Sequence, residues 1–282
     1  MTATASTRVR IGATILAVLA LAAVGAPLVA SSDPLRIEAV LARRTVAPFS
    51  LDATGTWHLL GTDRFGRDLL MRTLLAGRIS LAIGLSGALL ASAIGVTLGL
   101  LAAWRGGPID TAIRWVTDAM LAMPRLVLLL VGAALWPPSA WTVLLVLGAT
   151  GWMSVARLVR AEARQVRDAT FVEAARALGV SERVLLWRHV LPNAIGPAIV
   201  ATTLGVGNAI LLESGLSFLG LGVQPPAPSW GNMIAGGREL LLTAPWIALV
   251  PGLALIATAV ATALIGDALE DRLVARGARA DA

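Results

Sequence analysis

The chain alternates between long apolar runs and shorter polar segments. A helix needs roughly 20 mainly apolar residues to cross the hydrocarbon core of a bilayer. Six runs approach or exceed this length, at Ile11–Ala30, Ser80–Ala103, about Trp115–Leu135, about Trp141–Ala156, about Ile195–Leu219 and about Trp246–Ile265. This pattern predicts an all-α fold, a polytopic membrane bundle of six transmembrane helices.

Composition agrees with a membrane protein. Of 282 residues, 57% are hydrophobic and 14% are charged, whereas about a quarter of the residues of a soluble domain are charged. A buried soluble core would not produce so many runs of this length. The first run follows Arg8 and Arg10 and resembles a signal peptide, but it is longer than the usual signal core of about 7–15 residues. We therefore interpret it as a retained span.

The charged residues favour a lipid environment over nucleic acid. The net charge is +6, and the chain contains neither Cys nor Lys, so all 23 basic residues are Arg. These are spread between the apolar runs and form no single stripe, so we expect no nucleic-acid partner. Basic loops that face anionic lipid explain the charge.

The arginines also predict an orientation. Cytoplasmic loops are usually the richer in basic residues. With both termini inside, the inside segments hold 14 Arg and the outside segments eight, seven of them before the second span. The assignment depends mainly on the seven Arg between Arg157 and Arg188. We expect both termini and this cluster to be cytoplasmic.

A charged stretch interrupts the lipid-compatible sequence from Thr170 to Pro197, "TFVEAARALGVSERVLLWRHVLPNAIGP". Thr170 and Glu173 have the spacing of a capping box, which predicts a short helix over Phe171–Leu178. Gly179 then favours a left-handed stop.

A second short helix is predicted directly after this turn. Ser181 is a suitable N-cap for a helix over Glu182–Val190, and Pro192 is expected to end it. The first helix has a narrow surface that could lie in a groove of another protein, with Arg176 among the charges that would set its register. The alternative is a solvated loop with ordinary capping. The residues of the narrow surface are Ala174, Ala175, Ala177 and Leu178.

A few polar side chains fall at membrane depth, where charge is costly and usually marks a function or a partner. Arg125 follows Pro124 in the third run, and Asn208 and Glu213 lie in the fifth. We hypothesise that Arg125 and Glu213 face the bundle interior. Together with Asp118, at the start of the third run, these residues are the candidates for the pathway.

Small residues recur on one face of two of the runs. This spacing indicates close helix packing, with the lining of a pathway as the alternative. The positions are Gly84, Ala88, Ala91, Gly95 and Gly99 in the second run and Gly196, Gly205, Gly207 and Gly215 in the fifth.

Several chemistries have no support in the sequence. A phosphate-binding loop requires a lysine, and the chain has none. The two histidines, His58 and His189, belong to no metal-ligand pattern, and no G-x-S-x-G elbow is present. We therefore predict neither a metal site nor an enzyme, and any ATP must bind to another chain.

The charged stretch resembles the EAA loop of permease subunits of ABC importers. The matching positions are Glu173, Ala174, Ala175, Gly179, Leu191 and Pro192. The family pattern has Ile where this chain has His189. However, the His-Val-Leu-Pro-Asn run from His189 is similar to the version common in the dipeptide, oligopeptide and nickel branch.

Further segments resemble the C-type permeases of that branch. They are "HLLGTDRFGRDLLMRTLLAGRISLAIG" at His58–Gly84, Leu211–Ile234, Leu241–Leu255 and "IGDALEDRL" near the end. The resemblance covers roughly residues 58–273. It implies a permease domain there, preceded by residues 1–57, with the tail, the first span and the start of the outside segment, and followed by a cytoplasmic tail at 274–282.

The resemblance implies a role in a bacterial inner membrane. Two permease chains, this one and a B-type partner, would form the pathway. Two ATPase subunits would bind ATP and Mg and receive the loop at 165–194 as a coupling helix, and an extracytoplasmic binding protein would deliver the substrate. The implied coupling residues are Glu173, Ala174, Ala175, Arg176, Gly179, Leu191 and Pro192.

The substrate stays open between dipeptides, oligopeptides and nickel. Two alternative transport roles are an ABC permease for another small solute and an ion-coupled secondary transporter. The latter would show paired broken helices, and none is evident in the sequence. A membrane scaffold without transport is a further alternative, which substrate flux would exclude.

Overall fold

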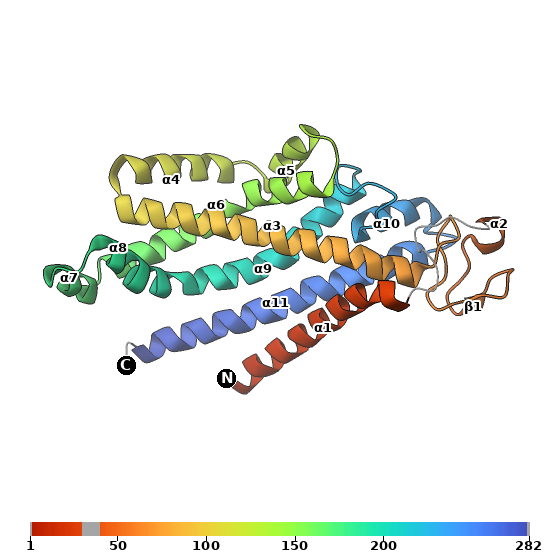
Figure 1. Ribbon diagram of the computed structural model, residues 1–282, viewed down its shortest axis with the longest axis horizontal. Coiled ribbons are helices and arrows are strands. Elements are labelled where there is room, and N and C mark those ends of the chain that lie inside the picture. Colours follow the sequence, from red (N-terminus) through yellow and green to blue (C-terminus); the bar gives the residue numbers. More distant parts are fainter. Residues whose placement is uncertain (1, 30–39, 281–282) are drawn as a thin grey trace.

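The computed structural model describes residues 2–29 and 40–280, and its helices run mostly along one long axis (Figure 1). Five helices are long and apolar enough to cross a membrane, within α1 (Thr2–Val29), α3 (Leu69–Arg105), α6 (Ala140–Arg167), the helical stretch Glu182–Phe218 and α11 (Trp246–Ala280). The predicted end of the first span, Ala30, lies outside the described residues. The fold class predicted from the apolar runs is confirmed.

The third predicted span is not one straight helix. The chain forms α4 (Gly107–Leu121) and α5 (Arg125–Ala134), which meet at an angle of 91°. The break falls at Pro124, whose ring removes a backbone donor and disfavours helical geometry at the residue before it. Figure 1 shows α3 and α6 running in the same direction, so the bent pair returns the chain along the bundle between them. Counted as one broken span, it gives six passes.

Small residues let α3 approach its neighbours closely, as their spacing predicted. All five small positions of its stripe are buried. A side chain added at Gly95 would lie 2.7 Å from the Trp152 carbonyl oxygen of α6, and one at Gly84 would collide with Ile210 of α9 (Leu191–Phe218). Close approach of this kind lets membrane helices associate through van der Waals contact.

The two ends of the bundle differ in structure. The end near β1 carries α2 (Val40–Arg43), the strands β1 (Ser50–Leu51) and β2 (Trp57–His58), which pair antiparallel, α10 (Trp230–Gly237) and the 3-10 turn η2 (Arg238–Leu240). The opposite end carries α7 (Thr170–Ala177), α8 (Glu182–Val184) and the π-helical η1 (Leu185–Val190). We call these the hairpin end and the loop end.

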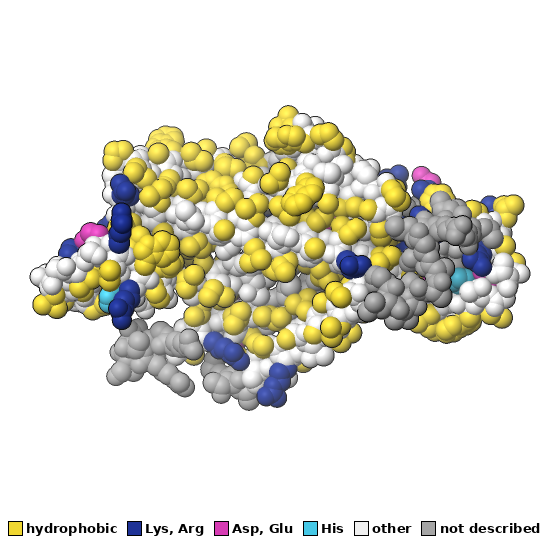
Figure 2. Space-filling model, in the orientation of Figure 1, with side chains coloured by type: hydrophobic (Ala, Val, Ile, Leu, Met, Phe, Trp, Pro, Cys, Tyr) yellow, Lys and Arg dark blue, Asp and Glu magenta, His cyan; other side chains and the backbone are white. Residues whose placement is uncertain are grey.

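The start of α1 and the end of α11 both lie toward the loop end (Figure 1). Arg8 of α1 pairs there with Asp271 of α11 at 3.4 Å. Helix α11 passes residue 273, the predicted limit of the permease domain, and continues to Ala280. Hydrophobic side chains cover much of the visible flank, and charged side chains gather mostly toward the ends (Figure 2), as expected for a bundle surrounded by lipid.

Candidate functional site

Helix α7 projects beyond the bundle at the loop end (Figure 1). Of its residues only Val172 is buried, and Glu173, Ala174 and Arg176 are exposed. Leu178, directly after the helix, is 85% exposed. The single chain thus leaves most of the Ala-rich surface free to contact another protein.

The start of α7 differs from the predicted capping box. The helix begins at Thr170 itself, with Ala169 as N-cap and no side-chain capping bond. The backbone N–H groups of Val172 and Glu173 donate to the Ala169 carbonyl oxygen instead. Thr170 is therefore one residue too far inside the helix to cap it.

The turn after α7 forms as the sequence predicts. Gly179 has a φ of +84°, in the left-handed region that glycine adopts without steric cost. Ser181 is the N-cap residue of α8, although its side chain makes no capping bond. Arg176 Nε donates to Glu182 Oε1 at 2.8 Å and closes the turn.

The second helix does not end at Pro192 as predicted. It continues through η1 into α9, so Glu182–Phe218 is one continuous helical stretch. The π-helical turn precedes the proline, and its wider spacing relieves the clash that a proline ring makes with the preceding turn. The loop is consequently joined to a membrane helix without a flexible linker.

Buried contacts fix the base of the loop. Val172 and Leu185 are fully buried, and the rings of Phe171 and His189 lie 6.4 Å apart. The guanidinium of Arg167 donates to the carbonyl oxygen of Ala103, at the end of α3. These contacts anchor the base of the loop to the bundle.

An ion pair at the base of the loop lowers the pKa of Asp168. Arg167 Nε donates to Asp168 Oδ1 at 2.8 Å. The hydrogen bond from this guanidinium holds the pKa of Asp168 below its ordinary value. The carboxylate thus stays charged at neutral pH, where the loop begins.

Glu213 lies fully buried in a cluster of serines. Ser217 Oγ donates to its Oε1 at 2.7 Å, and Ser214 Oγ lies 3.3 Å from its Oε2. The hydroxyls of Ser80 and Ser229 also face this carboxyl group. The position inside the bundle agrees with our hypothesis, and the neighbours explain how a carboxyl group is accommodated there.

Arg125 occupies a different environment and does not pair with Glu213. It is the first residue of α5, directly after the break. Its Nε is buried without a partner in the described structure, and its guanidinium packs over Gly151 of α6. The two charges are accommodated separately.

The remaining pathway candidates lie on the surface of the single chain. Asn208 is exposed on α9, and Asp118 is exposed on α4, where it pairs with Arg157 at 2.8 Å. The structure therefore does not bring the four candidates together into one site.

The sequence did not reveal the contacts that attach α4. Asp110 is buried and accepts from Arg160 at 2.7 Å and from Arg164 at 2.9 Å, both from α6. The spacing of four residues between Asp110, Arg114 and Asp118 would allow ion pairs within α4. In the structure, both aspartates instead pair with arginines of α6. Only knowledge of which helices are neighbours could have given these partners.

In the described chain no group of three His, Asp or Glu could hold a metal ion.

Residues 95–276 match the family of binding-protein-dependent transport system inner membrane components. The chain belongs to this family. The match includes α7, the turn at Gly179 and the continuous helix that follows, so the chain is a permease component of an ABC transporter.

Relatives agree over most of the chain. A Brucella suis protein, named provisionally as a peptide transport system permease protein, is 40% identical over 94% of this chain and 86% of its own length. The dipeptide transport system permease protein of Alkalihalophilus pseudofirmus is 38% identical over 77% of this chain and 71% of its own.

A solved structure supports the fold. A chain of the inward-facing MetNI methionine ABC transporter aligns with a TM-score of 0.52 at 18% identity and covers 67% of this chain and 90% of that one. At this identity the likeness concerns the fold alone.

Proposed function

We propose that this permease component imports short peptides. The observation that carries the proposal is the similarity, over most of the chain, to permeases whose names refer to peptide or dipeptide transport. In this proposal a B-type permease completes the pathway, and an extracytoplasmic binding protein delivers the peptide. Our candidates for residues that line the pathway remain Arg125, Glu213, Asn208 and Asp118.

The loop at 165–194 would couple this chain to two ATPase subunits. The exposed surface of α7 supports the proposal, because a short helix with small side chains can lie deep in a groove. The continuous helix from Glu182 to Phe218 would carry its movement into the membrane. ATP and Mg would bind to the ATPase chains, since this chain has no lysine for a phosphate-binding loop.

We assign the loop end and both termini to the cytoplasmic side of a bacterial inner membrane. The seven Arg between Arg157 and Arg188 support this orientation. The start of α1 and the end of α11 lie toward the same end of the bundle (Figure 1).

Copurification followed by transport tests the proposal. The chain is tagged at its C-terminus, extracted gently from native membranes, and its partners are identified by mass spectrometry. The complex is then placed in proteoliposomes with the binding protein. We expect ATP-dependent accumulation of a labelled dipeptide that ionophores do not abolish. Uptake that follows an ion gradient, or uptake of Ni²⁺ without peptide, would contradict the proposal.

A pair of alanine variants tests the coupling surface. Ala175→Arg places a long charged side chain on α7 and should abolish copurification of the ATPases while the permease stays in the membrane. Ala161→Arg makes the same change at an exposed position of α6, outside α7, and should retain them. Equal retention in both variants would remove α7 as the docking surface.

A further inference from the structure

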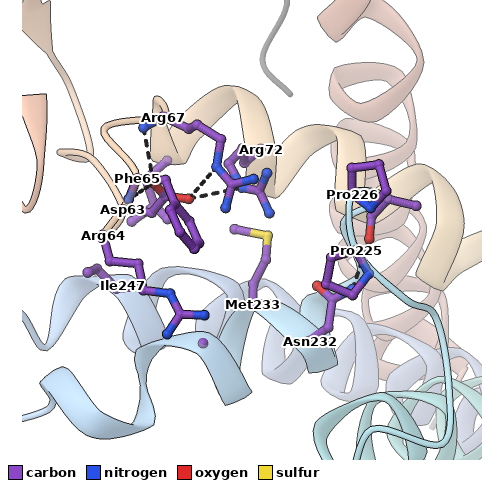
Figure 3. Close-up of a pocket in the computed structure, with 13 residues that line it drawn as sticks. Asp63, Arg64, Phe65, Arg67, Arg72, Pro225, Pro226, Asn232, Met233 and Ile247 are labelled. Carbon is purple, nitrogen blue, oxygen red and sulfur yellow. Dashed lines mark hydrogen bonds and ion pairs between the residues drawn. The ribbon is translucent and has the colours of Figure 1, made fainter. Parts of the chain in front are cut away.

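A cavity of about 370 Å³ opens at the hairpin end (Figure 3), at the other end of the bundle from α7 (Figure 1). The segment from Asp63 to Arg72 forms one wall, and α10, the loop before it and Ile247 of α11 form the other. Its size falls within the range of small-molecule sites, about 300–1,000 Å³. Its lining combines apolar side chains such as Phe65 and Met233 with three arginines.

Among the described residues that line the cavity, Asp63 is the one acidic side chain, and its carboxylate already has partners. Asp63 Oδ1 accepts from the backbone N–H groups of Phe65 and Arg67, and its Oδ2 faces Arg67 Nε at 2.8 Å and Arg72 Nε at 3.5 Å (Figure 3). Nearby Asp68 caps α3 and contacts His58 at 2.9 Å. In the described part of the chain, the Asp63 carboxylate contacts the guanidinium groups of Arg67 and Arg72 through the Nε atoms and not through the outer nitrogens.

Arg72 carries the strongest indication of a missing partner. The residue is only 6% exposed, and its Nη1 is buried without a hydrogen-bond partner in the described structure. An unpaired buried donor is costly, and more so on a charged group. Arg64 and Arg67 add positive charge, each with its guanidinium carbon 4.7 Å from the centre of the Phe65 ring. Among the described lining residues, three arginines thus surround one carboxylate.

Both walls of the cavity are fixed in place. Trp230 of α10 donates from Nε1 to the carbonyl oxygen of Thr73 at 3.0 Å, next to Arg72 on α3. The Asn232 side-chain amide donates to the carbonyl oxygens of Val223 and Ala227, which flank the proline loop. A ligand would therefore meet a largely preformed site, which lowers the entropic cost of binding.

We propose that this cavity binds the carboxylate of a small molecule with an apolar body. The guanidinium groups match a carboxylate in charge and in planar geometry, and the apolar wall suits the rest of the ligand. The assignment to the free C-terminus of a short peptide rests on the proposed function. A single acidic side chain from a docked protein would leave most of the cavity unfilled.

The test compares a dipeptide with its uncharged counterpart on the full chain. The protein is placed in phosphatidylcholine nanodiscs without its partners, and binding of Ala-Leu and of its C-terminal amide is measured by saturation-transfer NMR titration. We expect the acid to bind about tenfold or more tightly than the amide, as for a charge-assisted hydrogen bond. Arg72→Gln should remove the difference.

Two further variants separate binding from folding. Gly236→Leu adds a side chain where a Cβ meets no atom within 4 Å, so it should narrow the cavity and weaken acid binding while all the arginines remain. Arg78→Gln removes an exposed arginine of the same helix, outside the cavity, and should bind like the parent. Thermal unfolding confirms that each variant is folded.

Equal binding of acid and amide, or no binding of either to the folded chain, would overturn the proposal. An unchanged preference for the acid in folded Arg72→Gln would also overturn it. This assay measures binding and not uptake, and it contains no ATPase. A failure of the proposed peptide import would appear only in the proteoliposome experiment, so the two proposals can fail independently.

Discussion

Arg176 and Glu182 lie on opposite sides of the turn at Gly179, and Arg176 Nε donates to Glu182 Oε1 at 2.8 Å. Both side chains are substantially exposed, and exposed ion pairs contribute little to global stability. The pair instead links α7 to α8 across the turn, at the point where we propose that ATPase movement enters the chain.

Reversing one charge of this pair should impair coupling without unfolding the protein. Glu182→Arg is expected to lower transport-coupled ATPase activity in the assembled complex while the midpoint of thermal unfolding stays the same. The exchanged double variant, Arg176→Glu with Glu182→Arg, should recover much of the activity, because the contact is restored. A double variant no better than the single one would show that these charges contact the partner and not each other.

The contact between α5 and α6 predicts a steric effect at Gly151. A Cβ there would lie 2.8 Å from the Ala91 Cβ and 2.9 Å from Arg125 Nη2. Gly151→Ala should lower stability by about 1–3 kcal/mol, the usual cost of overpacking, seen as a lower unfolding temperature in detergent. Gly205→Ala in α9 is the matched control, because a Cβ there meets open space. Similar unfolding temperatures for both variants would refute the close contact.

The serine cluster around Glu213 predicts that replacing Ser217 lowers the stability of the protein. Its hydroxyl donates to Glu213 and accepts from the Val223 backbone N–H at 3.0 Å, both buried. Ser217→Ala removes one of the donors to Glu213 and leaves the Val223 N–H without its acceptor, so it should cost about 1–3 kcal/mol. Ser86→Ala serves as control, since Ser86 is only partly buried and its hydroxyl donates to the Ala82 carbonyl oxygen of its own helix. Equal thermal shifts in the two variants would mean that the buried network contributes nothing.

Asp52 predicts how the hairpin responds to acid. Burial alone would raise the pKa of this carboxyl group, but hydrogen bonds from Thr54, Thr56 and His58 outweigh it and hold the pKa well below its ordinary value. A pKa lowered by folding stabilises the folded state above the unfolded pKa, about 3.9, and the stabilisation is lost as pH falls further.

Asp52→Asn should therefore destabilise the hairpin at pH 5, and the difference from the parent should shrink as the pH falls below about 4. Hydrogen exchange of residues 49–59, corrected for intrinsic rates, measures this difference. A difference that grows as the pH falls toward 3 would contradict the assigned sign.

The sequence by itself determined the class of the protein, its spans and the position of its loop. Both signals are local. The length of an apolar run depends on the hydropathy of one segment, and a positive φ at glycine depends on the backbone sterics of one residue. The six runs and the stop at Gly179 could therefore be predicted. The break at Pro124 was also encoded locally, but apolar length alone does not distinguish a straight span from a bent one.

Tertiary structure decided which distant residues meet. The serines around Glu213, the arginines that hold Asp110 and the unpaired nitrogen of Arg72 all depend on neighbouring helices. The helical stretch Glu182–Phe218 continues through Pro192, and a π-helical turn precedes the proline, which the local sequence signal did not show. Charge and hydrogen bonding act across space, so burial and partners become visible only once the helices have packed.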